Sequence, residues 1–300
     1  MSSLAKPPLA GRVSIVTGGT SGIGLETVRG LAALGSTVVI VGRGEDRSRQ
    51  IAQQIATQTG NSSVTSIAVQ DLALLSETRQ LAGTLLGRFA QIHVLVNNAG
   101  AYFRRREVTS EGHERTFALN VLSPFLLSSL LAPRLVESAP ARIVNVTSAA
   151  HQGRTVDFDH LESPGRYSGF RTYGTSKLEL LLLTREFARR LGGTGVSVNA
   201  VHPGFVRSGF AQNNGGGTAA AIRFFGLLFG RSVSKGAETS IFVASDPSIA
   251  GVTGQYFADR KVTPGSPASQ EMGVARKLYD TCRELTEAPE IPVANPGGPR

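Results

Sequence analysis

A tyrosine and a lysine four positions apart, Tyr173 and Lys177, are the residues of this chain best suited to chemistry. On a helix, positions i and i+4 share a face, so the ammonium can lie close to the phenol. A free phenol has a pKa of about 10, and a fixed cation nearby favours its ionised form. The pair therefore predicts that Tyr173 exchanges a proton with an alcohol or a carbonyl group, with a lowered pKa.

Such a pair needs a scaffold, and the sequence predicts a parallel sheet. Short β-branched runs, typical of strands buried on both faces, cover 13–17, 37–41, 64–69, 94–97, 143–147 and 196–201, with a seventh at 254–258. Helix-length stretches lie between or after them, at 23–34, 46–59, 75–89, 111–136, 172–191 and 270–286. We expect an α/β chain with one doubly wound sheet. No repeat or linker divides it, so residues 1–287 form one predicted domain and the proline-rich residues 288–300 a disordered tail.

Composition limits the function classes. The 300 residues are 41% hydrophobic and 18% charged, which is typical of a globular protein. The net charge of +9 is spread along the chain, which favours ordinary surface charge over nucleic-acid binding. A single cysteine, Cys282, excludes an internal disulfide and favours a reducing, cytoplasmic location. The apolar segment 121–136 is interrupted by serine, proline and arginine, so no membrane span is expected.

The first predicted strand runs into a glycine-rich turn. In a doubly wound sheet, this loop presents backbone N–H groups and a helix N-terminus to a pyrophosphate. A tight strand-to-helix connection without a ligand is the alternative. The predicted cofactor-binding residues of this turn are Gly18, Thr20, Ser21, Gly22, Ile23 and Gly24.

The end of the second predicted strand bears on which dinucleotide would bind. An acidic residue there would bind the ribose hydroxyls of NAD and repel a 2′-phosphate, but the chain has Arg43. The arginine favours NADP(H) over NAD(H), although it could also be a solvated loop residue. After the third strand, Asp71, followed by Leu72, could accept a hydrogen bond from the adenine amino group or cap a helix.

Taken together, the motifs resemble those of the short-chain dehydrogenase/reductase family, over Gly11 to about Thr286. They are, in order, Thr17 to Gly24, Asn97 to Gly100, Asn120, Ser148, Tyr173 with Lys177, and Pro203 with Gly204. Within the family, 149–151, 157–159 and 184–204 are similar to the branch of the retinol dehydrogenases, the WW-domain oxidoreductase and protochlorophyllide reductase-like proteins. The resemblance implies a Rossmann-type sheet of seven parallel strands in the order 3-2-1-4-5-6-7, flanked by helices.

The resemblance also implies roles for individual residues. Ser148 would polarise the substrate oxygen, Tyr173 would transfer the proton, and Lys177 would hold the nicotinamide ribose. Asn120 would prop the catalytic site, although a buried amide that satisfies backbone groups is the alternative. Further residues implied to line the cofactor are Asn98, Ala99, Gly100, Pro203, Gly204 and Val206. Asn97 is expected to tie neighbouring strands together, and no metal site is expected.

Three segments depart from the common pattern or remain ambiguous. The interval between Ser148 and Tyr173 holds an extra loop, 153–170, that could shape the substrate pocket. Segment 215–230, with glycines followed by an apolar run, is interpreted as a substrate lid, with peripheral membrane contact as the alternative. The run Arg104 to Arg106 could attract an anionic group, but a solvated loop is favoured.

We therefore predict an NADP(H)-dependent carbonyl reductase or alcohol dehydrogenase for an apolar aldehyde, ketone or alcohol. It would be a monomer or homodimer without a transmembrane segment. A nucleotide-binding regulatory protein with little turnover is the alternative from another class.

Overall fold

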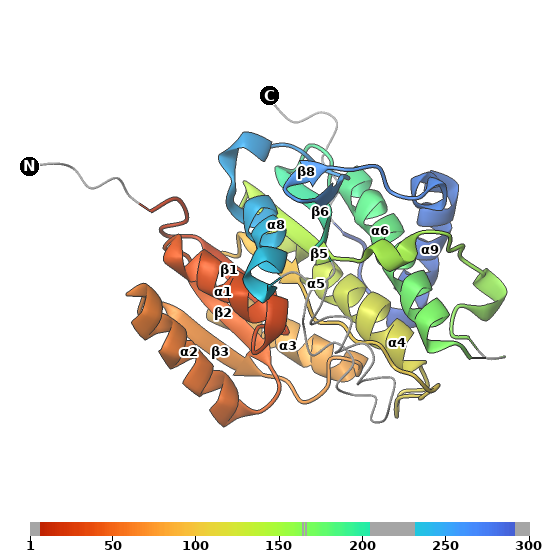
Figure 1. Cartoon of the computed structure of the whole chain (residues 1–300), viewed down its shortest axis with the longest axis horizontal. Coiled ribbons are helices and arrows are strands. Elements are labelled where there is room, and N and C mark those ends of the chain that lie inside the picture. Colours follow the sequence, from red (N-terminus) through yellow and green to blue (C-terminus); the bar gives the residue numbers. More distant parts are fainter. Residues whose placement is uncertain (1–6, 164, 166, 205–231, 292–300) are drawn as a thin grey trace, which may run out of the picture.

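An eight-stranded twisted sheet runs through the centre of the molecule, between two layers of helices (Figure 1). The structure is a computed structural model, and it describes residues 7–163, 165, 167–204 and 232–291. The strands are β1 (Val13–Thr17), β2 (Thr37–Gly42), β3 (Val64–Ala68), β4 (Val94–Asn97), β5 (Ala141–Val146), β6 (Val196–His202), β7 (Tyr256–Ala258) and β8 (Lys261–Val262). Their order in the sheet is β3-β2-β1-β4-β5-β6-β7-β8.

The predicted doubly wound arrangement is confirmed. The first seven strands are parallel to their neighbours, in the predicted order, and β1, β2, β4, β5 and β6 are made of the β-branched runs that burial on both faces requires. The eighth strand was not predicted. It pairs antiparallel with β7 after a two-residue turn at Asp259 and Arg260, whose φ values of 51° and 61° suit a tight hairpin.

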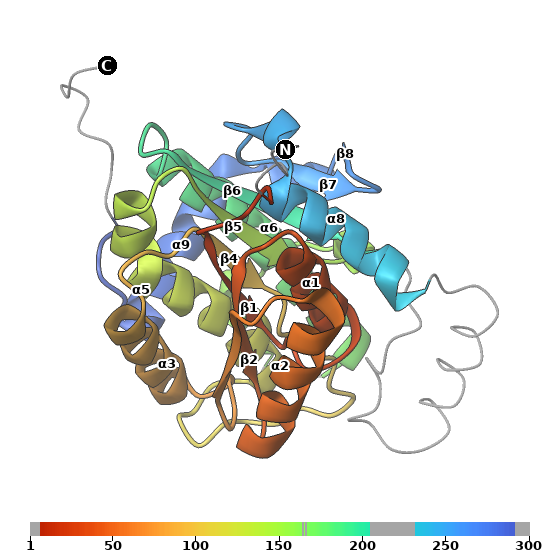
Figure 2. The ribbon, with the colours of Figure 1, turned by 90° about the vertical axis from the view of Figure 1, so that its left-hand side faces the viewer.

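Helices cover both faces of the sheet (Figure 2). One layer holds α1 (Gly22–Ala33), α2 (Glu45–Thr59) and α8 (Val233–Ser245). The other layer holds α3 (Leu75–Arg88), α5 (Ser123–Glu137), α6 (Gly169–Arg190) and α9 (Met272–Thr286). Short helical turns complete the described chain: α4 (Arg115–Phe117), η1 (Ala118–Leu122), η2 (Ala149–His151), η3 (Phe158–His160), η4 (Pro247–Ile249) and η5 (Pro267–Gln270).

The helix predicted at 111–136 is present, but its first residue and its regularity differ from the prediction. It begins at Arg115 and contains a π-helical turn, η1, before continuing as α5. The stretch Arg115–Glu137 has a mean hydropathy of 1.5 and is the one described helix with the length and apolarity of a membrane span. However, 83% of its apolar window is buried inside the fold, as expected for a central core helix.

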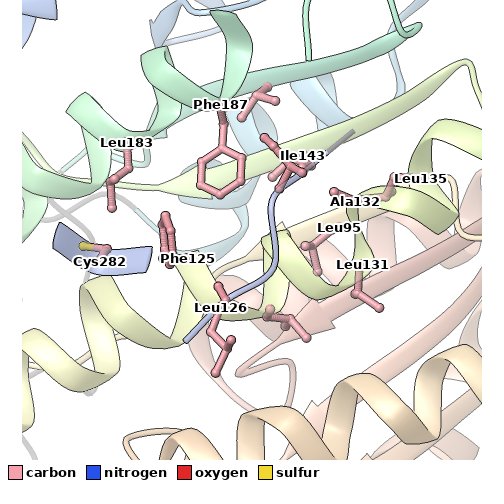
Figure 3. Packing of buried hydrophobic residues seen from close by; sticks show 14 of the residues in the cluster. Leu95, Phe125, Leu126, Leu131, Ala132, Leu135, Ile143, Leu183, Phe187 and Cys282 are labelled. Atoms are coloured by element: carbon pink, nitrogen blue, oxygen red, sulfur yellow. The ribbon is translucent and has the colours of Figure 1, made fainter. Parts of the chain in front are cut away.

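The core between the sheet and α5, α6 and α9 is aromatic at its centre. Phe125, Phe187 and Tyr279 contact one another edge to face, with ring centroids 5.1–5.4 Å apart. Figure 3 shows Phe125 and Phe187 with Cys282 nearby, and burial raises the pKa of that free thiol. Ala288 and Ile291, at the start of the predicted tail, are buried against this core, whereas 292–300 lie outside the described residues.

Candidate active site

The glycine-rich turn after β1 takes a shape that favours glycine. Gly18 and Gly22 have φ values of 66° and 55°, in the left-handed region. A Cβ on Gly24 would lie 2.3 Å from the Gly18 carbonyl oxygen and 2.4 Å from Asn98 Nδ2. The turn therefore packs tightly against the strand-four loop, and the start of α1 fits a pyrophosphate.

Asn98 holds this turn through its side chain. Its Nδ2 donates to the carbonyl oxygens of Thr17, at 2.8 Å, and Gly18, at 3.3 Å. In return, Thr17 Oγ1 accepts from the backbone N–H groups of Asn98 and Ala99, both at 3.0 Å. The sequence motif includes Thr17, but it predicted backbone contact with a cofactor at 98–100 and not these side-chain hydrogen bonds between the two loops.

Asn97 ties strands together, as predicted. Its Nδ2 donates to Asn145 Oδ1 on β5 at 2.8 Å and to Ser128 Oγ on α5 at 3.0 Å. Asn97 is thus a structural residue beneath the site.

Asn120 lies on the π-helical turn η1 and is completely buried. Its Oδ1 accepts from the Ala101 N–H, and its Nδ2 donates to the Ala101 carbonyl and to Ser176 Oγ, each at 3.0 Å. A Cβ on Gly100 would lie 3.1 Å from both Asn120 Oδ1 and Lys177 Nζ. The amide thus satisfies backbone groups and also borders Gly100, as the lysine does, so the two roles weighed for it are compatible.

Tyr173 and Lys177 lie together on α6, as predicted. Both are buried, and Lys177 Nζ is 5.7 Å from the centroid of the Tyr173 ring. Lys177 Nζ also donates to the Val146 carbonyl at the end of β5, at 3.0 Å. Ser148, two residues further along, hydrogen-bonds the phenol of Tyr173. Ser148, Tyr173 and Lys177 therefore meet at the carboxyl end of β5, where open parallel sheets bind their ligands.

The pKa of Tyr173 shifts opposite to the prediction. Burial raises it to about 12, and only the hydrogen bond with Ser148 opposes that change. Burial also lowers the pKa of Lys177 to about 8. Loss of solvation disfavours both charged forms, and it is the largest cause of each shift.

Ser148 is held by the turn that follows it. Its Oγ accepts from the Ala150 N–H at 3.2 Å, and η2 packs closely on α6, since a Cβ on Gly174 would lie 2.5 Å from the Ala150 carbonyl. The extra loop 153–170 ends close to Tyr102, since a Cβ on Gly169 would lie 3.0 Å from Tyr102 Cε2, and the Tyr102 ring meets Tyr173 edge to face at 6.4 Å.

Arg43 is exposed at the end of β2, beside the glycine-rich turn. Its neighbour Gly42 lies so close to Thr20 that a Cβ would come within 2.2 Å of Thr20 Cγ2. Arg49, by contrast, is paired with Glu45 on its own helix, at 2.5 Å. Arg43 thus lies one residue from the contact between β2 and the glycine-rich turn.

Asp71 is already engaged by the protein. One oxygen accepts from Arg115 Nη2 at 2.6 Å and the other from the Ala73 N–H at 3.0 Å. Helix α3 begins only at Leu75, so Asp71 closes a local turn and is not the helix cap suggested as its alternative role. Leu72 beside it is half-buried.

Only some of the remaining predicted site residues lie in the part of the chain that the structure describes. Pro203 and Gly204 follow β6, and Gly204 has a φ of 81°. Val206 and segment 215–230 lie outside the described residues. In the run Arg104 to Arg106, all exposed, Arg106 Nε donates to the carbonyls of Glu162 and Ser163, at 3.3 and 3.1 Å.

A doubly wound sheet with a glycine turn after its first strand and a serine, tyrosine and lysine at the end of its fifth defines a dinucleotide-binding oxidoreductase. The model of the short chain dehydrogenase family matches residues 12–217. The chain belongs to the short-chain dehydrogenase/reductase family, in its retinol dehydrogenase-like branch. It is thus an oxidoreductase that acts on CH–OH or C=O groups with a nicotinamide dinucleotide.

Similar proteins cover nearly the whole chain. Human retinol dehydrogenase 12 is 39% identical over 280 residues, which are 92% of this chain and 87% of that protein. Human polyprenol dehydrogenase is 35% identical over 286 residues, 93% of this chain and 86% of that protein.

Solved structures show the same fold. A protein from Mycobacterium paratuberculosis is 27% identical, with a TM-score of 0.76 over 96% of this chain and 98% of that one. A short chain dehydrogenase from Burkholderia cenocepacia in complex with NADP is 26% identical, with a TM-score of 0.66 over 83% of this chain and 96% of that one.

Proposed function

We propose that this protein is an NADP(H)-dependent carbonyl reductase or alcohol dehydrogenase for an apolar aldehyde, ketone or alcohol, with Tyr173 as the acid and base. The observation that carries the proposal is the meeting of Ser148, Tyr173 and Lys177 at the carboxyl end of β5. A bound nicotinamide supplies or accepts the hydride. The protein has to bind the substrate oxygen and move one proton.

Each residue has a defined part in that proton transfer. A phenol with a pKa of about 12 is protonated at neutral pH, so Tyr173 can donate to the substrate oxygen during reduction. Ser148, already within hydrogen-bonding reach of Tyr173, orients the same oxygen. Lys177 and Asn120 both border Gly100, where Lys177 would hold the ribose side of the site. The ammonium of Lys177 would favour the phenolate during alcohol oxidation.

The cofactor residues fit a dinucleotide. The glycine turn around Gly18 to Gly24 would take the pyrophosphate, with Ala99 and Gly100 close to the nicotinamide half and Pro203 and Gly204 beside the ring. Arg43 supports NADP(H), because it is exposed at the strand end next to Gly42, which packs on Thr20 of the glycine turn, and a guanidinium is suited to bind a 2′-phosphate. Structures named as NADP complexes occur among the similar proteins.

An apolar substrate agrees with the surroundings of the tyrosine. Tyr102 covers one edge of the Tyr173 ring, and Phe170, at the start of α6, is 60% exposed. Retinol and polyprenol, in the names of two relatives, are alcohols with long hydrocarbon chains. The cytoplasmic location, the peripheral membrane contact, the monomeric or dimeric state and the division at residue 287 stay predictions.

The test follows NADPH and NADH consumption with a panel of aldehydes, ketones and quinones, for the wild type and Tyr173→Phe. The variant is expected to lose about 10²–10⁴-fold in kcat, the usual contribution of an acid–base group, while still binding NADPH. Tyr279→Phe is the matched control, because its buried hydroxyl has no hydrogen-bond partner among the described residues. Unchanged turnover in Tyr173→Phe would refute the assignment. Tight NADPH binding without turnover of any carbonyl would favour the regulatory protein.

A further inference from the structure

His151 lies three residues after Ser148 and is completely buried. Both of its ring nitrogens are engaged. Nδ1 lies 2.7 Å from the Ser148 carbonyl oxygen, which can only accept, so this nitrogen carries the proton. Nε2 lies 3.1 Å from the backbone nitrogen of Ser266, which donates, so this nitrogen is unprotonated. The two partners together fix one neutral tautomer of the ring.

Two hydrogen bonds hold the Ser148 carbonyl oxygen, and the one from the His151 ring is the shorter. The backbone N–H of His151 also donates to that oxygen, but at 3.3 Å. The 2.7 Å bond from the ring therefore fixes the Ser148 peptide more firmly than the short turn η2 does by itself.

The far end of this contact belongs to the C-terminal part of the chain. Ser266 lies between β8 and α9, and its carbonyl accepts from Ser269 Oγ at 2.7 Å. Ser266 and Ser269 are both buried, so the segment is fixed where it meets the histidine. One imidazole thus links two segments 115 residues apart.

We propose that His151 is a positioning residue that sets the orientation of Ser148 by anchoring its carbonyl to the C-terminal segment around Ser266. The packing around the ring supports the neutral form that this bridge requires. Tyr256 of β7 packs edge to face on it, with ring centroids 5.2 Å apart. Burial lowers the pKa of His151, the bond to Ser148 partly opposes this, and the charge of Arg185 on α6 lowers it further.

Two substitutions of His151 by amide side chains test its hydrogen bonds to Ser148 and Ser266 separately. In His151→Asn, the side-chain Nδ2 can occupy the place of ring Nδ1, which keeps the donor to Ser148 and removes the acceptor for Ser266. In His151→Gln, the side-chain oxygen can occupy the place of Nε2, which keeps the acceptor for Ser266 and removes the donor to Ser148. The corresponding changes at the exposed His160, which pairs with Asp157, are the matched controls.

The inference rests on the proposed function for its kinetic test. We expect the fall in kcat to be about 10- to 100-fold larger in His151→Gln than in His151→Asn, with little change in the KM for NADPH, because a small displacement of a catalytic group costs rate. Hydrogen exchange at the Ser266 amide is expected to show the reverse order, with faster exchange in His151→Asn. Equal kcat values in the two variants, or equal Ser266 exchange, would overturn the proposal.

A spectroscopic measurement tests the bridge without turnover. In a long-range ¹⁵N–¹H spectrum of the wild type, the signal that disappears in His151→Gln is expected to be an Nδ1–H tautomer. An Nε2–H tautomer would overturn the bridge whether or not the enzyme is active. If the wild type turns over no carbonyl, that result contradicts the proposed function instead. The tautomer of His151 is then the test of the hydrogen-bonded bridge.

Discussion

Tyr173 and Lys177 lie side by side on α6, and yet the phenol is harder to ionise than a free tyrosine. Both side chains are buried, and Lys177 directs its ammonium at the Val146 carbonyl. In this environment the pKa of Tyr173 is raised to about 12 and that of Lys177 is lowered to about 8. The protein without cofactor therefore favours a neutral phenol, the form that donates a proton in carbonyl reduction.

Cofactor choice can be tested at a single residue. Arg43→Asp replaces a cation beside the glycine turn with an anion, which would repel a 2′-phosphate and accept hydrogen bonds from ribose hydroxyls. We expect the ratio of kcat/KM for NADPH to that for NADH to fall by about 100-fold, equivalent to about 2.7 kcal/mol. Steady-state kinetics with both cofactors measures the ratio.

Arg49→Asp provides the control for that substitution. It makes the same change of charge on α2, but Arg49 is paired with Glu45 and Asp46 and is not at the strand end. A similar fall in both variants would show that general surface charge, rather than Arg43, sets the preference.

The glycine turn and the first helix act as one element. Gly24→Ala places a methyl group 2.3 Å from the Gly18 carbonyl, so the turn or α1 must move. We expect NADPH affinity to fall at least about tenfold and stability to fall by about 1–3 kcal/mol, as in other overpacked sites. Fluorescence titration and thermal unfolding measure the two effects.

Gly83→Ala on α3 provides the comparison for that helix substitution. A Cβ at Gly83 has no atom within 4 Å, and alanine favours helix, so stability is expected to rise by about 0.5–1 kcal/mol with no change in NADPH affinity. Gly24→Ala with undiminished affinity would mean that the turn does not contact the cofactor.

At the level of elements, local patterns predicted most of the sheet and its helices. The strand positions follow from β-branched runs, and the motif residues follow from their places at strand ends. Helix α8 was missed, although Ser232 caps it by accepting from the Lys235 N–H. At the C-terminal end of α8, Arg142 of β5 donates hydrogen bonds to the carbonyls of Val243 and Asp246. That contact spans about a hundred residues, and no local pattern reports it.

Across the whole molecule, the contacts that escaped prediction are long-range ones. The bridge from His151 to Ser266 and the burial of Ile291 depend on how the C-terminal part packs back onto α6 and α9. The π-helical turn at Asn120 likewise depends on hydrogen bonds to Ala101 and Ser176 from other elements. Sequence motifs could therefore indicate candidate site residues, but not the side chains that hold them in place.

Two buried carboxyl groups on α6 should give the whole fold opposite responses to pH. Glu179 is buried and has an oxygen without a partner among the described residues. Burial, aided by the charge of Glu114, raises its pKa to about 8. Burial also acts to raise the pKa of Glu186, but hydrogen bonds from Arg189 and Arg190, at 2.6–2.9 Å, hold it below the ordinary value.

The direction of each stability change follows from whether the folded or the unfolded state binds the proton more tightly. Near pH 7 the folded state keeps the Glu179 proton that the unfolded state loses near pH 4.5, so this group makes folding less favourable as pH rises from 4.5 to about 8. Glu179→Gln removes that penalty and should raise the free energy of unfolding at pH 8 by on the order of a few kcal/mol, with a smaller gain at pH 5. Glu186→Gln should lower the free energy of unfolding by about 1.5–3 kcal/mol at pH 7. That loss should shrink as pH falls through the lowered pKa of Glu186.

Urea unfolding of the wild type and the two variants at several pH values, from about 3 to about 8.5, measures both effects, because the Glu186 contribution is lost only below its ordinary pKa. The difference between Glu179→Gln and the wild type should widen as pH rises from about 4.5 to about 8, whereas the deficit of Glu186→Gln should stay nearly constant down to about pH 4.5 and narrow only below it. Parallel stability curves for Glu179→Gln and the wild type would mean that Glu179 is ionised in the folded protein. That result would require a cation or a water beside its second oxygen, because an isolated buried carboxylate is too costly to persist.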